Sequence, residues 1–86
     1  MKSGTHGSDI SAVEVLHISP HGFWLLAGQS EYFLDYDHFP WFRNATVSQI
    51  SNVEAYFGRV FRWPDLDVDL DVDRITRPEN YPLLAQ

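Results

Sequence analysis

Five aspartates, each separated from the next by one residue, are the side chains of this sequence most able to do chemistry: Asp65, Asp67, Asp69, Asp71 and Asp73. Clustered carboxylates suggest a calcium site, since hard cations take several oxygen ligands. An EF-hand loop needs Gly at its sixth position and Glu at its twelfth, and a loop from Asp65 has Leu70 and Thr76 there. A loop from Asp67 fails in the same way, with Val72 and Pro78. The run does not match this calcium motif.

The residues between the aspartates are apolar: Leu66, Val68, Leu70 and Val72. This period of two predicts an extended segment with one packed face and one charged face. In water the repulsion between neighbouring carboxylates is small, and charged strand edges deter aggregation. We interpret the run as a solvated acidic edge, with a partner surface and a weak cation site as the alternatives.

Catalysis by paired carboxylates requires that burial separate their pKa values. Asp69 and Asp35 are the two acids expected in a half-buried setting, and for Asp69 we favour a structural role as acceptor for turn or helix-start amides. The histidines show no metal-ligand spacing, the serines lie in no nucleophile motif, and there is no Gly-rich phosphate loop or cysteine. We expect no enzymatic activity, no cofactor and no metal centre.

The aromatic residues form the remaining constellation. A chain of 86 residues has a thin core, so the default expectation is that the large rings fill it. The rings expected in the core are Trp24, Phe33, Trp41, Phe61 and Trp63. The alternative is an exposed apolar patch in the least regular segment, since such patches mark partner sites. Its members would be Tyr36, Phe39, Trp41 and Phe42, flanked by Arg43, Arg59 and Arg62.

Length and composition restrict the function further. The length fits one domain, expected over residues 12–86 behind a disordered leader at 1–11. The net charge is −6, with one Lys and five Arg, so direct binding of nucleic acid is not expected. An acidic domain more readily binds a basic protein or a cation. Without an apolar run of spanning length or an apolar N-terminal signal region, we expect a cytoplasmic location and no membrane association.

The first half of the chain predicts an antiparallel meander. Its strands are expected over Ala12–Ile18, Phe23–Ala27 and Tyr32–Tyr36. We expect Val13, Val15 and His17 on one face of the first strand. The turn signal Ser19-Pro-His-Gly22 precedes the second strand, whose continuous apolar character favours a central strand covered on both faces.

The second half predicts short helices around another hairpin. Asp37 is expected to cap one helical turn, and Thr46 and Gln49 match a capping box. A hairpin is expected from Asn52–Phe57 and Arg59–Trp63, in which Phe61 and Trp63 share a face and Pro64 ends the strand. Asp71 is expected to cap a helix over Val72–Thr76, with Asp73 in its first turn. The tail Tyr81–Leu84 is expected to fold back on the core.

Four segments resemble the bacterial domain-of-unknown-function (DUF) family 2442: Ile18-Ser-Pro-His-Gly-Phe-Trp24, Phe39-Pro-Trp-Phe42, Trp63-Pro-Asp-Leu-Asp-Val-Asp-Leu70 and Arg77-Pro-Glu-Asn-Tyr-Pro82. The resemblance covers about residues 12–84. It implies a small α+β domain of antiparallel strands with one or two short helices, and it brings no catalytic residues. It also implies a small protein encoded nearby as a toxin–antitoxin partner. The family often has Ser at the position of Asp71, which supports a capping role.

Together these observations predict an α+β domain with a small antiparallel β-sheet of two hairpin or meander units and one or two short helices. We expect a non-enzymatic protein-interaction module, an acidic antitoxin-like partner of a small, basic protein encoded beside it, and a homodimer is a further option. The residues expected to bind are Trp41, Phe42, Trp63, Asp65, Asp67 and Asp69. The alternative is a domain that binds a small ligand or divalent cation in an aromatic pocket next to Asp69.

Overall fold

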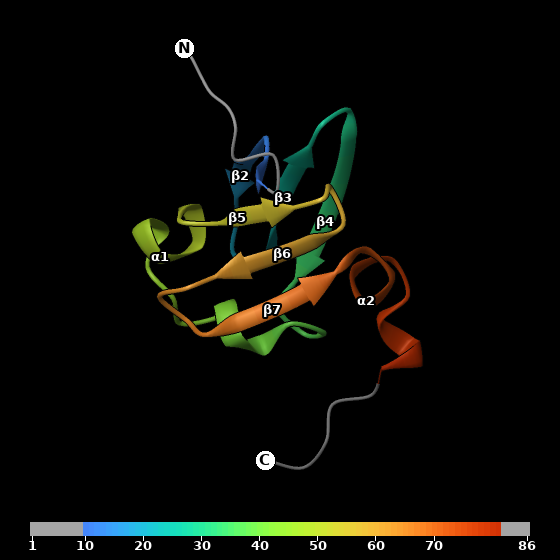
Figure 1. The fold of residues 1–86 in the computed structure, drawn as a ribbon. Coiled ribbons are helices and arrows are strands. Elements are labelled where there is room, and N and C mark those ends of the chain that lie inside the picture. The colour runs from blue at the N-terminus through green and yellow to red at the C-terminus, as the bar shows by residue number, and fades with distance from the viewer. Residues whose placement is uncertain (1–9, 82–86) are drawn as a thin grey trace.

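The structure, a computed structural model, describes residues 10–81 of the chain, with side chains from Ala12. Figure 1 labels its main elements in chain order. They are β1 (Ile10–Ser11), β2 (Val13–Ile18), β3 (Gly22–Ala27), β4 (Ser30–Asp35), the 3₁₀ turn η1 (Pro40–Phe42), α1 (Val47–Ser51), β5 (Glu54–Tyr56), β6 (Val60–Trp63), β7 (Val68–Asp71), α2 (Val72–Thr76) and the 3₁₀ turn η2 (Pro78–Asn80). The strand β1 includes Ile10 and Ser11, which the prediction placed in the leader. Residues 1–9 of the expected leader, and the expected tail from residue 82, lie outside the described residues.

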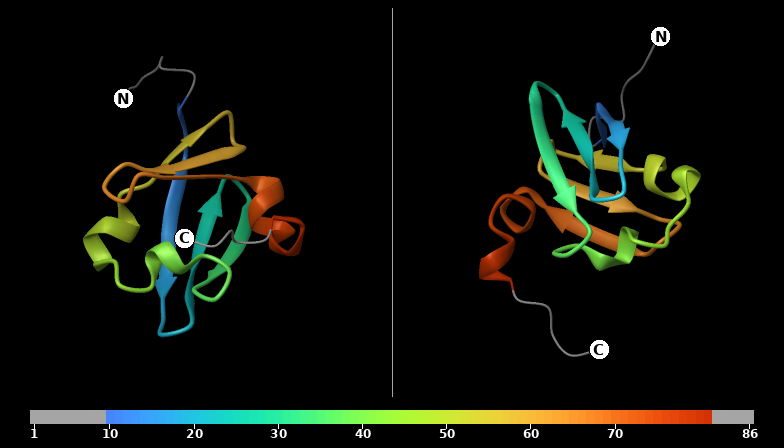
Figure 2. Two further views of the ribbon diagram at one scale, coloured as in Figure 1. Left: turned by 90° about the horizontal axis from the view of Figure 1, so that it is seen from below. Right: turned by 180° about the vertical axis from the view of Figure 1, so that it is seen from behind.

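The strands form two antiparallel sheets, one in the order β2-β3-β4 and the other in the order β1-β5-β6-β7. Only Ala12 separates β1 from β2, so one nearly continuous stretch of chain pairs with β5 at its start and with β3 along the rest. The two sheets lie face to face with their strands crossing steeply (Figures 1 and 2), as in orthogonal sheet packing. The predicted α+β class fits loosely, because the helices are short.

The two helices lie at opposite edges of the sheet β2-β3-β4. α1 packs beside β2, and α2 packs beside β4. Figure 1 shows α1 and α2 on opposite sides of the molecule. The helices thus flank this sheet at its edges, and its outer face is formed by the strands alone.

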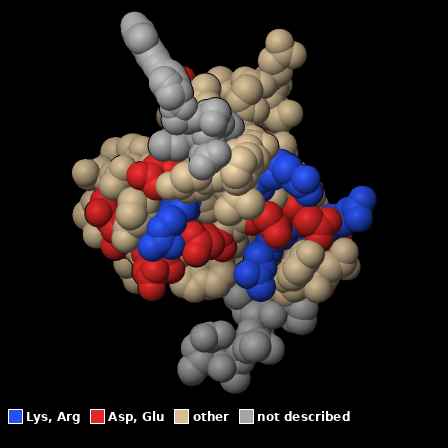
Figure 3. Space-filling model, in the orientation of Figure 1, with Lys and Arg blue, Asp and Glu red and all other residues tan. Residues whose placement is uncertain are grey.

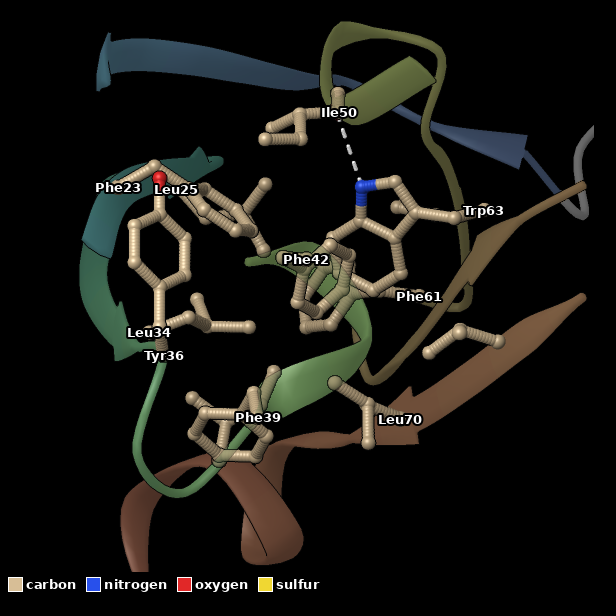
Figure 4. Close-up of a cluster of buried hydrophobic side chains, with 13 residues drawn as sticks. Phe23, Leu25, Leu34, Tyr36, Phe39, Phe42, Ile50, Phe61, Trp63 and Leu70 are labelled. Atoms are coloured by element: carbon tan, nitrogen blue, oxygen red, sulfur yellow. Dashed lines mark hydrogen bonds between the residues drawn. The ribbon is translucent and has the colours of Figure 1, made fainter. Parts of the chain in front are cut away.

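Three aromatic rings meet at the centre of the core between the sheets (Figure 4). The ring of Phe42 lies edge-on to Phe23 and to Trp63, with centroids 4.9 and 4.8 Å apart. Trp63 is fully buried, and its Nε1 donates a hydrogen bond of 2.9 Å to the carbonyl oxygen of Ile50. This bond satisfies the one polar atom of the indole and ties β6 to α1.

The inward faces of the strands follow the period of two. In β6, Phe61 and Trp63 are buried while Val60 faces outward, as predicted. β3 is central in its sheet, as predicted, but it is covered on one face only. Phe23 and Leu25 are buried, whereas Trp24 is 40% exposed. The prediction of two covered faces is wrong because the other sheet packs on the inner face and the helices pack at the edges.

A β-bulge in β2 contradicts the predicted side-chain pattern. Val15 pairs with Leu25, but the next pair is His17 with Trp24, so Leu16 is an extra residue. The bulge reverses the alternation, as bulges do. His17 therefore lies on the outer face beside Trp24, not on the inner face with Val13 and Val15. After the bulge Ile18 packs against the core.

The segment around η1 also differs from the prediction. Phe39 occupies the N-cap position without a side-chain hydrogen bond, and Asp37 instead forms an ion pair of 2.8 Å with Arg43. Phe39 and Phe42 dock into the core, whereas Trp41, which was expected there, is 44% exposed. The segment of residues 39–42 thus buries two of its three aromatic rings and presents Trp41 to solvent.

The predicted caps of both α-helices are confirmed. Thr46 and Gln49 form a complete capping box at α1. At α2 the carboxylate of Asp71 accepts a hydrogen bond of 2.8 Å from the backbone N–H of Arg74, and Asp73 lies in the first turn.

The Asp71 cap gives a direct stability prediction. Asp71→Ala is expected to lower the free energy of unfolding by about 1 kcal/mol, since it removes the acceptor for a helix-start amide. Asp71→Ser, which keeps an acceptor at the same position, is the matched control and should cost less than half as much. Urea unfolding followed by circular dichroism measures both. An equal loss for the two variants would show that the charge of Asp71, and not its capping bond, stabilises α2.

Candidate interaction surface

The structure divides the aspartate run into a turn and a strand. Residues 64–67 form the turn between β6 and β7, in which Asp67 has a positive φ of 55°. Asp65 accepts a hydrogen bond of 3.0 Å from Asn52 Nδ2. The predicted alternation holds only within β7, where Val68 and Leu70 are buried between exposed aspartates. The prediction of one extended segment from Asp65 is therefore wrong, because the chain must reverse after Pro64 to pair β7 with β6.

The carboxylates of this run are interleaved with arginines. Arg62 donates to Asp69 at 2.8 Å and to Asp67 at 3.2 Å. These hydrogen bonds raise the pKa of the Arg62 guanidinium. Asp69 is exposed and accepts from Arg62, so the predicted half-buried setting and amide partners are wrong. Figure 3 shows acidic and basic side chains mixed over the face of β5, β6 and β7. This face is therefore not uniformly acidic.

Of the predicted aromatic site residues, only Trp41 lies at the surface. Phe42 and Trp63 are 1% and 0% exposed. A role for these two in direct contact with a partner is excluded while the fold is intact, because each is enclosed by other rings. The alternative patch around Trp41 is wrong for the same reason, since Tyr36, Phe39 and Phe42 are all buried.

A different aromatic surface covers the outer face of the sheet β2-β3-β4. Trp24 and Phe33 are directly paired across β3 and β4, with ring centroids 5.2 Å apart. They are 40% and 38% exposed, and Leu16 in the neighbouring bulge is 43% exposed. Both rings were expected in the core. We call Leu16, Trp24 and Phe33 the outer aromatic patch, and Figure 2 (right) shows their sheet from the outside.

Gly22 helps to position the patch. A Cβ atom on Gly22 would lie 2.7 Å from Cζ of Phe33 and 2.3 Å from the carbonyl oxygen of Leu34. The ring of Phe33 therefore lies close over bare backbone, and this brings it beside Trp24. Aromatic rings often cover strand glycines in this way. The sequence signal for this packing of an aromatic ring over a strand glycine is the pattern Gly-Phe-Trp at the start of β3.

Acidic residues lie at both ends of the patch on its own sheet. Leu26 pairs with Glu14 on one side and Glu31 on the other, and Gly22 pairs with Asp35. Because Trp24 points outward, the residues two positions away along each strand share its face. A shallow hollow of about 120 Å³ adjoins this end of the sheet, lined by residues that include Glu14 and Leu26. The surface thus has an apolar centre and a carboxylate rim.

Asp35, at one end of the rim, is held by His38. Its carboxylate accepts a hydrogen bond of 3.0 Å from the His38 backbone N–H and contacts Nδ1 of the ring at 2.9 Å. Partial burial alone would raise the pKa of Asp35, but the hydrogen bonds from His38 outweigh it and lower the pKa.

The lowered pKa predicts a pH effect. An acid whose pKa is lower in the folded state adds stability above its unfolded pKa of about 4, and that stability is lost as the pH falls through the folded pKa. We expect the free energy of unfolding to fall below about pH 4, and to fall less steeply in Asp35→Asn. Glu31→Gln makes a similar change in charge away from His38 and should leave the slope as in the original chain. Parallel slopes for all three proteins in urea unfolding across pH 2–6 would contradict the role of Asp35.

Two further hollows adjoin Val60 on the other sheet. One, of about 360 Å³, is lined by Phe57, Val60 and Asp71 among others. The second, of about 320 Å³, includes Asp69 and Tyr81. Phe57 is 68% exposed and has a positive φ of 57°, which is rare for a bulky residue. These are open grooves with charges of both signs.

Among the residues that the structure describes, no group of three His, Cys, Asp or Glu side chains is placed to hold a metal ion. Nor does any helix in that part of the chain have the length and apolar character needed to cross a membrane.

The crossed sheets, the aromatic core and the uncovered outer face define a small α+β domain with an exposed aromatic patch. A sequence model of one family matches residues 12–81, which is most of the chain. The chain belongs to that family, described as Protein of unknown function (DUF2442), as the sequence segments predicted. No curated protein and no solved structure matches the chain.

Proposed function

We propose that the chain is a non-enzymatic protein-interaction module that binds a protein partner through the outer aromatic patch. The observation that supports this most is the exposure of Trp24, Phe33 and Leu16 together on one sheet. Exposed apolar clusters mark partner sites, and Trp is enriched among the residues that dominate binding energy. The register of β3 and β4 fixes the two rings before binding, so little conformational entropy is lost when a partner covers them.

The family resemblance points to a small protein encoded beside this chain as the partner, in an antitoxin-like role for this chain. A cytoplasmic location is part of the same proposal. The sequence predicts binding through Asp65, Asp67 and Asp69 and through Trp41, Phe42 and Trp63. The outer aromatic patch is a stronger basis, since Phe42 is buried and Arg62 bonds two of those aspartates.

Calorimetric titration with the product of the neighbouring gene tests the proposal. Trp24→Ser and Phe33→Ser should each weaken binding by about 30-fold, the loss expected at an interface hot spot. Trp41→Ser is the matched control, because Trp41 is exposed to a similar degree at η1. Circular dichroism checks that each variant is folded. Loss of binding in Trp41→Ser with full binding in Trp24→Ser would contradict the proposal.

A second candidate function is small-ligand binding in the groove beside Asp69. It is favoured by the hollow of about 320 Å³ in which Tyr81 and Arg74 face Asp69 and Val60. The guanidinium of Arg74 lies 5.0 Å from the ring centre of Tyr81, so a flat cationic and aromatic surface lines one side. A thermal-shift screen of small carboxylates and of Ca²⁺ and Mg²⁺ tests it. A stabilising compound whose effect is lost in Tyr81→Ala would support this function, and no stabilisation by any compound would exclude it.

A further inference from the structure

We propose that the outer aromatic patch binds a basic partner and not a second copy of this chain. In the partner segment, an apolar side chain lies between two Lys or Arg residues. The inference rests on the proposed function and specifies the chemistry of the partner at the same surface. It follows from the distribution of charge over the fold and from the spacing of the rim.

The arginines are confined to the part of the chain after residue 38, whereas the acids lie in both parts. Residues 12–38, which include the whole sheet β2-β3-β4, contain no Lys or Arg. They contain four acids: Glu14, Glu31, Asp35 and Asp37. All five arginines follow, at Arg43, Arg59, Arg62, Arg74 and Arg77. At a pH where the histidines are neutral, any charge that the sheet itself presents around the patch is therefore negative.

The arginines do not neutralise the rim. Within residues 10–81 their ion pairs go to Asp37, Asp67, Asp69 and Asp73. In the same part of the chain Glu14 and Glu31 form no ion pair, and Asp35 pairs with His38. Glu14 and Glu31 remain available to a partner and Asp35 shares its carboxylate with the exposed His38, whereas Asp67 and Asp69 of the aspartate run already bind Arg62.

The geometry of β4 sets the distance between two of the rim carboxylates. Glu31, Phe33 and Asp35 alternate along β4, so all three lie on the outer face with the ring between the two carboxylates. A rise of about 3.3 Å per residue puts the two acids roughly 13 Å apart. An extended partner segment with Lys or Arg at positions i and i+4 and an apolar residue at i+2 matches this spacing. Glu14, across Leu26 from Glu31, adds a third carboxylate at one end.

The same distribution of charge disfavours a second copy of this chain at the outer aromatic patch. If two outer faces paired, each apolar centre would be covered, but acidic rims would meet acidic rims, and like charges across an interface select against a partner. The rim therefore discourages self-association through the patch, while it attracts a basic surface. The homodimer considered from the sequence is not expected at this face.

Three nine-residue peptides test the inference by titration into the ¹⁵N-labelled chain. Their centres are Arg-Thr-Leu-Thr-Arg, Glu-Thr-Leu-Thr-Glu and Arg-Thr-Ser-Thr-Arg. We expect the first to shift the Trp24 indole and the amides of β4, and to bind about fivefold or more tightly than the other two. Glu14→Gln with Glu31→Gln should remove this preference, and salt at about 0.5 M should weaken it.

The outcomes separate this inference from the proposed function. Equal binding of the acidic and basic peptides, or no shift at the patch with any peptide, would overturn the basic partner, while the calorimetric result with Trp24→Ser would still decide the proposed function. Sedimentation equilibrium of the original chain should show a monomer at physiological salt. A dimer that Trp24→Ser dissociates would identify a second copy as the occupant and overturn the inference.

Discussion

Trp63→Ala is expected to lower the free energy of unfolding by about 3–5 kcal/mol, the cost of deleting a large aromatic side chain from a core. Trp63 is fully buried and packs edge-on against Phe42 and Phe23. The substitution also leaves the carbonyl of Ile50 without its indole donor. Since small domains have a total stability of about 5–15 kcal/mol, this loss is a large share of the stability of the fold.

Two variants separate the causes of this loss. Trp63→Phe keeps an aromatic ring but removes the hydrogen bond to Ile50, and it should cost about 1–3 kcal/mol. Trp41→Ala removes the same side chain from an exposed site and should cost about 1 kcal/mol or less. Urea unfolding of the three variants ranks their losses in the free energy of unfolding. A loss in Trp41→Ala as large as in Trp63→Ala would show that the core is not centred on Trp63.

Gly22→Ala is expected to cost about 3 kcal/mol, at the upper end of the range for overpacked sites. The added Cβ would lie 2.3 Å from the Leu34 carbonyl oxygen and 2.8 Å from Cα of Asp35, both backbone atoms of the paired strand β4. Backbone held in a ladder cannot rotate aside, so β3 and β4 must separate locally. The substitution should therefore weaken both the fold and the placement of Phe33.

Gly28→Ala and Gly58→Ala are the controls for Gly22→Ala. Both glycines have a positive φ, of 62° and 67°, and a Cβ atom on either would meet nothing within 4 Å. Each substitution should cost about 1–2 kcal/mol, from the left-handed backbone alone. Thermal unfolding monitored by circular dichroism compares the three. If Gly22→Ala were the mildest of them, close packing of Phe33 over β3 would be contradicted.

The sequence was sufficient for the features set by local rules. The period of two gave the inward residues Phe61 and Trp63, and the cap patterns gave the starts of α1 and α2 at Thr46 and Asp71. Each of these features depends on a few neighbouring residues. The family segments likewise predicted the family that the sequence model identifies.

The features of the surface could not be predicted from such local rules, because they depend on how the strands and sheets pack. Trp24 lies in a continuous apolar run, and its exposure follows only from the absence of a covering layer on β3 in the described structure. The extra residue Leu16 reverses the facing of His17 without any Gly or Pro to mark the bulge. Arg62 bonds Asp67 and Asp69 because β6 and β7 pair in a register that brings Arg62 opposite Asp69.

The most direct test of the proposed interaction surface uses the indole N–H signals of the three tryptophans. Trp24 reports on the outer aromatic patch, Trp41 on η1 and Trp63 on the core. In a cross-saturation experiment with the ¹⁵N-labelled chain and the unlabelled product of the neighbouring gene, we predict strong attenuation of the Trp24 signal alone. Attenuation of the Trp41 signal with an unchanged Trp24 signal would contradict the account.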